Sequence, residues 1–124
     1  MIVSMMQVAL GGAIGSALRF GIGATLTRPG QAFPVGVLTV NVLGSLLMGS
    51  FATWFASRGG ASWQPFVLTG LLGGFTTFSA FSLEAWTLWE RGQGGLAASY
   101  VGASVTLSLA ALALGVWLAR AVAA

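Results

Sequence analysis

Residues 66–89 read FVLTGLLGGFTTFSAFSLEAWTLW, and their length and composition already indicate a membrane protein. The stretch holds one ionisable residue, Glu84, and is longer than the roughly 20 residues that a spanning helix needs. Gly73 and Gly74, followed by hydroxyl and aromatic residues, make a poor continuous helix. A break at membrane depth survives only where protein buries it or where it lines a cavity. We therefore expect a spanning helix that is interrupted at Gly73 to Thr77.

Three further apolar stretches lie at about residues 5–26, 35–56 and 96–119, and short links rich in glycine and proline separate them. Of the 124 residues, 56% are hydrophobic and 6% are charged, whereas a soluble domain carries roughly 25% charged residues. So few charges cannot cover a surface that faces water. The sequence therefore predicts an all-α membrane protein with four transmembrane helices that form one domain over residues 1–124.

The five basic residues are all arginines and lie far apart, unlike the clustered stripe of a nucleic-acid-binding protein. An even number of spanning helices puts both chain ends and the middle link on one side of the membrane. That side carries Arg58 and Arg120, and the opposite side carries Arg28 and Arg91. Orientation normally follows an imbalance of basic residues between the two sides, and here there is almost none. We expect insertion in both orientations and an antiparallel homodimer; the alternative is one orientation set by weaker cues.

Residue types that carry chemistry are almost absent. The chain has no cysteine and no histidine, and its basic residues include no lysine. A serine therefore has no base to activate it, and no paired carboxylates or phosphate-binding loop are found. These features indicate that the chain is not an enzyme.

Polar groups inside a bilayer are costly, so each one is a candidate functional residue. Asn41 lies within the second stretch, where its amide either joins two helices or serves the site directly. Tyr100, Ser104 and Ser108 repeat every four residues, which places their hydroxyls along one face of the fourth helix. They either bond to their own backbone or form a track of donors for a passing ion.

Other candidates lie in the first and third stretches. Phe78 and Phe81 share a helical face, where they either pack or turn their weakly positive ring edges toward an anion. Glu84 is followed by tryptophans, which favour the membrane interface, so it is expected near water. Arg19 either extends toward the interface or anchors a polar contact that attracts anions. Carbonyls freed by the interrupted helix are good ligands for a hard cation such as Na⁺.

Two pairs of glycines have the spacing that lets membrane helices approach closely. Gly11 and Gly15 lie in the first stretch, and Gly70 and Gly74 lie in the third. Ordinary helix packing explains them. No strand precedes Gly11, so we reject a dinucleotide-binding loop at this position.

Three segments carry a resemblance to a known family: GGAIGSALRF at residues 11–20, PVGVLTVNVLG at 34–44 and GLLGGFTTFSAFSLE at 70–84. With them the chain resembles the Fluc, or CrcB-type, bacterial fluoride channels over nearly its whole length. The resemblance implies an antiparallel dual-topology homodimer in the bacterial cytoplasmic membrane, with two pores for passive fluoride exit. It also implies a third helix broken at the dimer centre, where the backbone carbonyls of Gly73 and Thr76 hold a structural Na⁺.

The same resemblance assigns roles to the candidate residues. It implies that Phe78 and Phe81 face fluoride with their ring edges and that Asn41 lines the pore. Tyr100, Ser104 and Ser108 match the polar track of the fourth helix, and we add the hydroxyl of Thr77 as a further donor. Arg19 matches a vestibule arginine, and Glu84 matches a family glutamate.

The sequence departs from the family pattern at a few positions. Ala80 replaces a hydroxyl residue in the third segment, Leu112 stands where some members continue the polar track, and Val35 and Val37 replace commoner residues. Two other functions are compatible with four helices. A small multidrug transporter shares the length and dual topology but typically needs an acidic residue in its first helix, which is absent here. A membrane scaffold without transport is the other alternative.

Overall fold

The computed structural model describes residues 1–123, which fold into helices joined by short links. The elements in chain order are α1 (Ile2–Leu26), α2 (Val35–Arg58), η1 (Ala61–Trp63), η2 (Pro65–Leu72), α3 (Gly73–Phe75), α4 (Phe78–Glu90) and α5 (Gly94–Ala123). Four helical segments are long and apolar enough to span a membrane, and the third of them is Ala61–Glu90. The expected all-helical fold with four spans is therefore confirmed.

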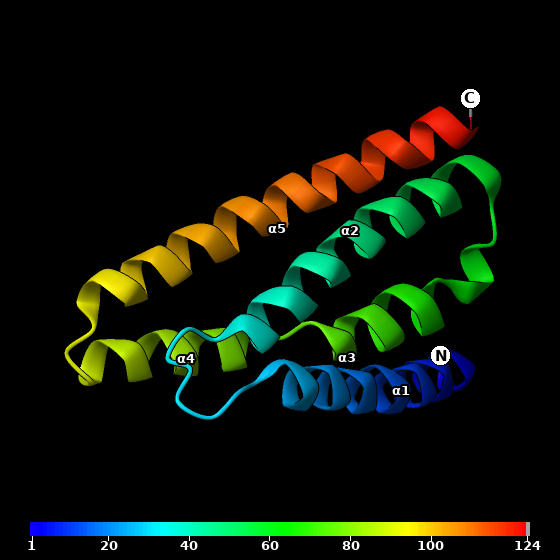
Figure 1. The fold of residues 1–124 in the computed structure, drawn as a ribbon. Coiled ribbons are helices and arrows are strands. Elements are labelled where there is room, and N and C mark those ends of the chain that lie inside the picture. The colour runs from blue at the N-terminus through cyan, green and yellow to red at the C-terminus, as the bar shows by residue number, and fades with distance from the viewer. Residues whose placement is uncertain (124) are drawn as a thin grey trace.

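The spans form two pairs that run in opposite directions (Figure 1). α2 and α5 lie side by side and run in the same direction. α1 packs along η2 and α3, and these three elements run together in the direction opposite to α2 and α5. α4 continues beyond α3 and packs against the first half of α5. Both chain ends lie at the same end of the molecule, together with the link between α2 and η1.

Glycines allow α1 to approach η2 and α3 at the distance of backbone contact. A Cβ atom added at Gly15 would collide with the carbonyl oxygen of Leu71, and one at Gly74 would lie 2.9 Å from the carbonyl oxygen of Gly12. Gly11 and Gly70 face each other in the same way. The packing role predicted for the two glycine pairs is confirmed, since only a residue without a side chain fits at these contacts.

Glycines also fix how α2 and α5 lie against each other. A Cβ atom at Gly49 would collide with the carbonyl oxygen of Leu112, and one at Gly115 would collide with that of Leu46. These two contacts set the register of the pair, because neither helix can slide without driving a side chain into the opposing backbone.

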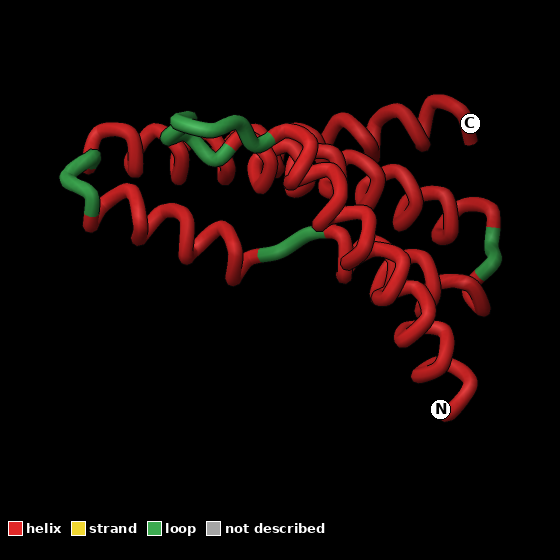
Figure 2. Tube along the Cα trace, turned by 60° about the horizontal axis from the view of Figure 1, so that its bottom comes forward, coloured by secondary structure: helices red, strands yellow, loops and turns green. Residues whose placement is uncertain are grey.

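The third span changes its backbone geometry along its length. Pro65–Leu72 forms a π-helix, Gly73–Phe75 forms one α-helical turn, and the chain then becomes extended (Figure 2). Thr76 has φ −89° and ψ 157°, and Thr77 has φ −153° and ψ 119°. Helix resumes at Phe78.

The interruption is shorter than the sequence suggests, because Gly73 and Gly74 remain helical. Gly73 N donates to the carbonyls of Gly70 and Leu68. Gly74 instead serves the close approach to Gly12 on α1. Within the predicted interval of Gly73 to Thr77, only Thr76 and Thr77 are extended, and Gly73–Phe75 remain helical.

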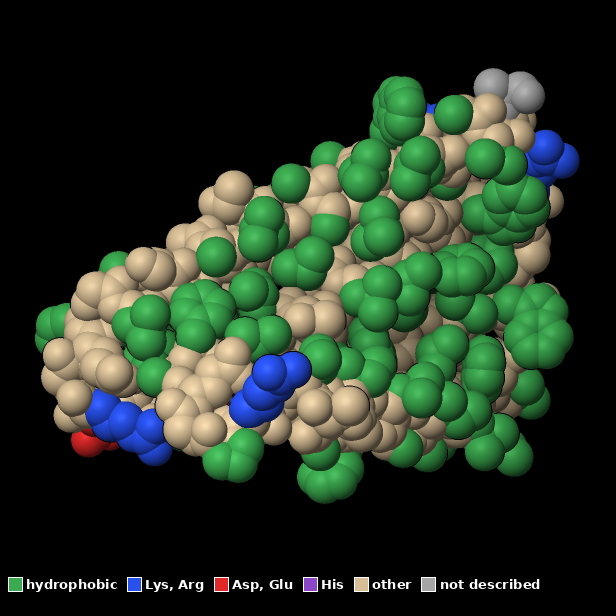
Figure 3. All heavy atoms as spheres, viewed as in Figure 1, with side chains coloured by type: hydrophobic (Ala, Val, Ile, Leu, Met, Phe, Trp, Pro, Cys, Tyr) green, Lys and Arg blue, Asp and Glu red, His purple; other side chains and the backbone are tan. Residues whose placement is uncertain are grey.

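Many large hydrophobic side chains are exposed on the surface. Large apolar side chains project from the helices over the face shown in Figure 3, and charged side chains are few on that face. A small aromatic core forms where α4 meets α5, around Leu88, Ala97 and Tyr100. A chain with such a surface and such a small core is stable in hydrocarbon, where apolar exposure carries no penalty. The protein is a multi-pass membrane protein.

Candidate functional site

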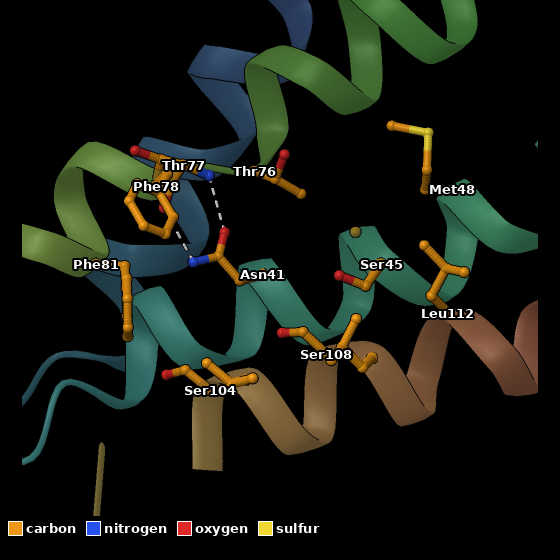
Figure 4. A pocket seen from close by; sticks show the side chains of 13 residues that line it. Asn41, Ser45, Met48, Thr76, Thr77, Phe78, Phe81, Ser104, Ser108 and Leu112 are labelled. Atoms are coloured by element: carbon orange, nitrogen blue, oxygen red, sulfur yellow. Dashed lines mark hydrogen bonds between the residues drawn. The ribbon is translucent and has the colours of Figure 1, made fainter. Parts of the chain in front are cut away.

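A groove of about 410 Å³ opens between α2, the extended residues, α4 and α5 (Figure 4). Polar and aromatic side chains gather along it among apolar ones. Its lining consists of Asn41, Gly44, Ser45, Met48, Thr76, Thr77, Phe78, Phe81, Ser104, Val105, Ser108, Leu109 and Leu112.

Asn41 holds the extended segment in place from α2. Its Oδ1 accepts a hydrogen bond from the backbone N of Thr77 at 2.8 Å, and its Nδ2 donates to the carbonyl of Thr77 at 3.1 Å (Figure 4). One side-chain amide thus satisfies both backbone groups of Thr77, as a neighbouring peptide would. Nδ2 carries two N–H groups, so one N–H of Asn41 remains available to the groove.

Thr77 also begins α4. Its Oγ1 accepts from the backbone N of Ala80 at 3.1 Å, which is the usual N-cap arrangement. In a continuous helix, the N of Ala80 would bond the carbonyl of Thr76, and the N of Thr77 would bond that of Gly73. Both donors are engaged elsewhere here, so the carbonyls of Gly73 and Thr76 lose their helical partners.

Arg19 supports the other side of the interruption from α1. Its Nε donates to the carbonyl of Gly74 at 3.0 Å, and the side chain is partly buried. In a continuous helix that carbonyl would accept from the N of Phe78. A cation at the carboxyl end of a helix is also favoured by the helix dipole. Arg19 does not line the groove.

Four aromatic rings form a chain that leads into the groove. The ring centroids of Phe78 and Phe81 lie 5.5 Å apart, and those of Phe81 and Tyr100 lie 5.3 Å apart. Phe33, from the link between α1 and α2, meets Tyr100 edge to face at 5.6 Å. Phe78 and Phe81 share one side of α4, as their spacing predicts.

Two buried hydroxyls in this region have no hydrogen-bond partner among residues 1–123. They belong to Tyr100 and Ser104, which are 0% and 6% exposed. An unpaired buried hydroxyl is costly, and more so in hydrocarbon than beside water. Ser104 is one of the residues that line the groove.

The groove unites most of the residues predicted from the sequence: Asn41, Thr76, Thr77, Phe78, Phe81, Ser104 and Ser108. Tyr100 lies behind Phe81 and is fully buried rather than part of the lining. Glu84 is partly buried on α4, outside the groove.

Sequence reasoning did not single out Ser45 or Met48. Both follow Asn41 on α2 at four and seven residues, a spacing that places all three on one helical face. That spacing is the sequence pattern from which Ser45 and Met48 could have been predicted. No sequence pattern marks Phe33, because its contact with Tyr100 joins distant parts of the chain.

Four spans, an interrupted third span and a groove lined with donors define a helical membrane protein whose site suits a small polar solute. Comparison of the sequence with known families narrows this class. Residues 6–116 match the CrcB-like protein family, described as Camphor Resistance (CrcB). The chain belongs to this family.

Curated relatives agree over almost the full length. A protein of Ruegeria sp. (strain TM1040) is 57% identical over 98% of both chains, and one of Paracoccus denitrificans (strain Pd 1222) is 53% identical over 94% of both. A third, from Cereibacter sphaeroides (strain ATCC 17029 / ATH 2.4.9), is 58% identical over 93% of both. Each is named a fluoride-specific ion channel FluC. Ion channels are not enzymes, which agrees with the prediction made from the sequence.

Proposed function

We propose that this protein is a fluoride-selective channel that lets fluoride leave the bacterial cytoplasm passively. The observation that carries the proposal is the groove, where the buried Ser104 hydroxyl and one N–H of Asn41 have no partner among residues 1–123. The names of the relatives point to the same ion. The rings of Phe78 and Phe81 border the same space.

Fluoride is small and strongly hydrated, so a pathway must replace its water with other donors. The N–H of Asn41 and the hydroxyls of Ser104, Ser108 and Thr77 supply them. Phe78 and Phe81 add positive ring edges, which attract an anion more weakly than a hydrogen bond does. Conduction needs this balance, because an ion that binds too tightly does not leave.

The channel that we propose is an antiparallel homodimer with two pores. In a single chain the groove is open along its side, and Phe78, at its edge, is 79% exposed. A second copy would close the groove and cover this ring. The balanced arginines of the two membrane faces support a dimer of opposite orientations.

The backbone at the interruption fits a structural Na⁺. The carbonyls of Gly73 and Thr76 have lost their helical donors, to Asn41 and to the hydroxyl of Thr77. Hard cations prefer oxygen ligands, and two carbonyls from each of two chains would supply four of them. Gly73 is exposed in the single chain, where a second copy can meet it. When bound, the cation would tie the two interrupted helices together.

The proposal is tested by reconstituting the purified protein in liposomes and recording fluoride release with an ion electrode. We expect rapid fluoride efflux without proton exchange, and none of chloride in matched vesicles. Phe81→Ile keeps the apolar volume but removes the ring edge, so it should reduce fluoride efflux at least about tenfold. Absence of fluoride release, with uptake of a cationic dye driven by a proton gradient, would favour a multidrug transporter instead.

A further inference from the structure

Ser45 lines the groove but is not one of the donors in the fluoride pathway proposed for this protein. It lies on α2 one turn beyond Asn41, and Figure 4 shows its side chain on the groove side of the helix, as are those of Asn41 and Met48. Its side chain is partly buried.

The hydroxyl of Ser45 differs from its neighbours along the same helix in how it is satisfied. Serine in a membrane helix commonly donates to the carbonyl four residues earlier. Ser50 does so, bonding Leu46 at 2.8 Å, and Ser57 bonds Thr53 at 2.9 Å. Ser45 makes no hydrogen bond to any of residues 1–123, so its donor is free for a guest in the groove.

The packing of α2 on α5 tells which residue Ser45 faces. Gly49 lies against the backbone of Leu112, and the two helices run in the same direction. One turn back on each helix therefore brings Ser45 level with Ser108. A further turn brings Asn41 level with Ser104, the buried serine without a partner.

The same register shows where the polar lining ends. About one turn beyond Ser45 and Ser108, the groove residues on the two helices are Met48 and Leu112, both apolar. A fluoride ion that moves along the groove toward them meets its last pair of side-chain donors at Ser45 and Ser108.

We propose that Ser45 donates a hydrogen bond to fluoride opposite Ser108, so that α2 as well as α5 supplies a hydroxyl to the polar pathway. The proposal rests on the fluoride channel function proposed above. Two hydroxyls from different helices would hold the ion from both sides at this level. A hydroxyl on one helix alone would leave half of the ion facing the apolar wall of α2.

The test compares Ser45→Ala, Ser45→Thr and Ser50→Ala in liposomes. Ser50→Ala is the matched control, because that hydroxyl already bonds Leu46 and lies outside the groove. We expect Ser45→Ala to raise the fluoride concentration for half-maximal flux about tenfold, as loss of a hydrogen bond to a charged group does. Ser45→Thr keeps the donor and should stay close to the unmodified protein, and so should Ser50→Ala.

Size-exclusion profiles of all variants establish that each one assembles. A wild-type protein that releases no fluoride would overturn the channel function itself. If the wild type conducts and Ser45→Ala has unchanged half-saturation, the inference about Ser45 fails while the channel function stands. An equal loss in Ser45→Ala and Ser50→Ala would also overturn it, because it would indicate a general effect of helix packing.

Discussion

Asn41 bonds both backbone groups of Thr77, and this pairing suggests a sharp test at the scale of one residue. Asn41→Asp retains an acceptor for the N of Thr77 but replaces the donor that meets its carbonyl with a second oxygen. The new charge also repels an anion in the groove. We expect fluoride efflux to fall at least about tenfold. The electrode assay measures this, with Ser82→Ala as control because that exposed hydroxyl bonds Phe78 on its own helix.

Arg19 offers a second test, because its contact with Gly74 and its charge predict different responses to salt. If Arg19 acts by capping the carbonyl of Gly74, Arg19→Gln should lower fluoride flux several-fold at every ionic strength. If it acts by attracting anions, the difference from wild type should shrink as salt screens the charge, with a Debye length of about 3 Å at 1 M. We expect the first result, measured as initial efflux rates from 20 mM to 1 M salt, roughly spanning weak to strong screening.

The sequence identifies these two polar residues as candidates but does not identify the groups that they bond. The polarity of Asn41 and Arg19 inside apolar stretches marks them as candidates, since such groups are costly in hydrocarbon. Their partners are not readable, because Asn41 and Thr77 are 36 residues apart and Arg19 and Gly74 are 55 apart. The sequence suggests vestibule chemistry for Arg19, whereas the structure shows it bonded to the backbone of α3.

At the scale of elements, the contact of α1 with η2 and α3 depends on the absence of side chains. Gly15→Ala places a methyl group against the carbonyl of Leu71, which is backbone and cannot move aside cheaply. We expect a loss of about 1 to 3 kcal/mol of stability, seen as a lower thermal midpoint in detergent. Gly21→Ala on the same helix is the control, since nothing lies within 4 Å of its added methyl. An equal shift for both variants would contradict the packing argument.

The ends of the spans follow from local sequence, whereas the interruption of the third span depends on contacts between distant residues. Hydrophobic length alone predicts four spans, and the observed helices differ from the expected ranges by a few residues at their ends. The position of the interruption did not follow from propensity. Gly73 and Gly74 disfavour a helix, yet it persists through them and ends at Thr76, where Asn41 and Thr77 supply bonds that replace the helical ones.

For the whole molecule, the balanced arginines predict that orientation can be forced. Gln31→Lys with Gln93→Lys adds charge to one membrane face, and Ser57→Lys with Ser62→Lys adds it to the other. We expect each double variant to insert in a single orientation and to lose fluoride flux when expressed alone. Coexpression of the two should restore flux, because opposite orientations are then both present. Topology reporters at the chain ends and the electrode assay measure the two effects, and full flux from either variant alone would contradict antiparallel pairing.

The sequence by itself determined that this chain lies in a membrane, that it spans it four times and that its third span is irregular. These properties follow from local composition, because the bilayer responds to the length and polarity of each stretch separately. Only the tertiary structure decided that the side chain of Asn41 bonds both backbone groups of Thr77 and that Arg19 bonds the carbonyl of Gly74. It also decided that Ser45 lies level with Ser108. Such pairings depend on how closely the helices approach and in which register they pack. Glycine contacts between distant segments set both, so no single stretch of sequence contains them.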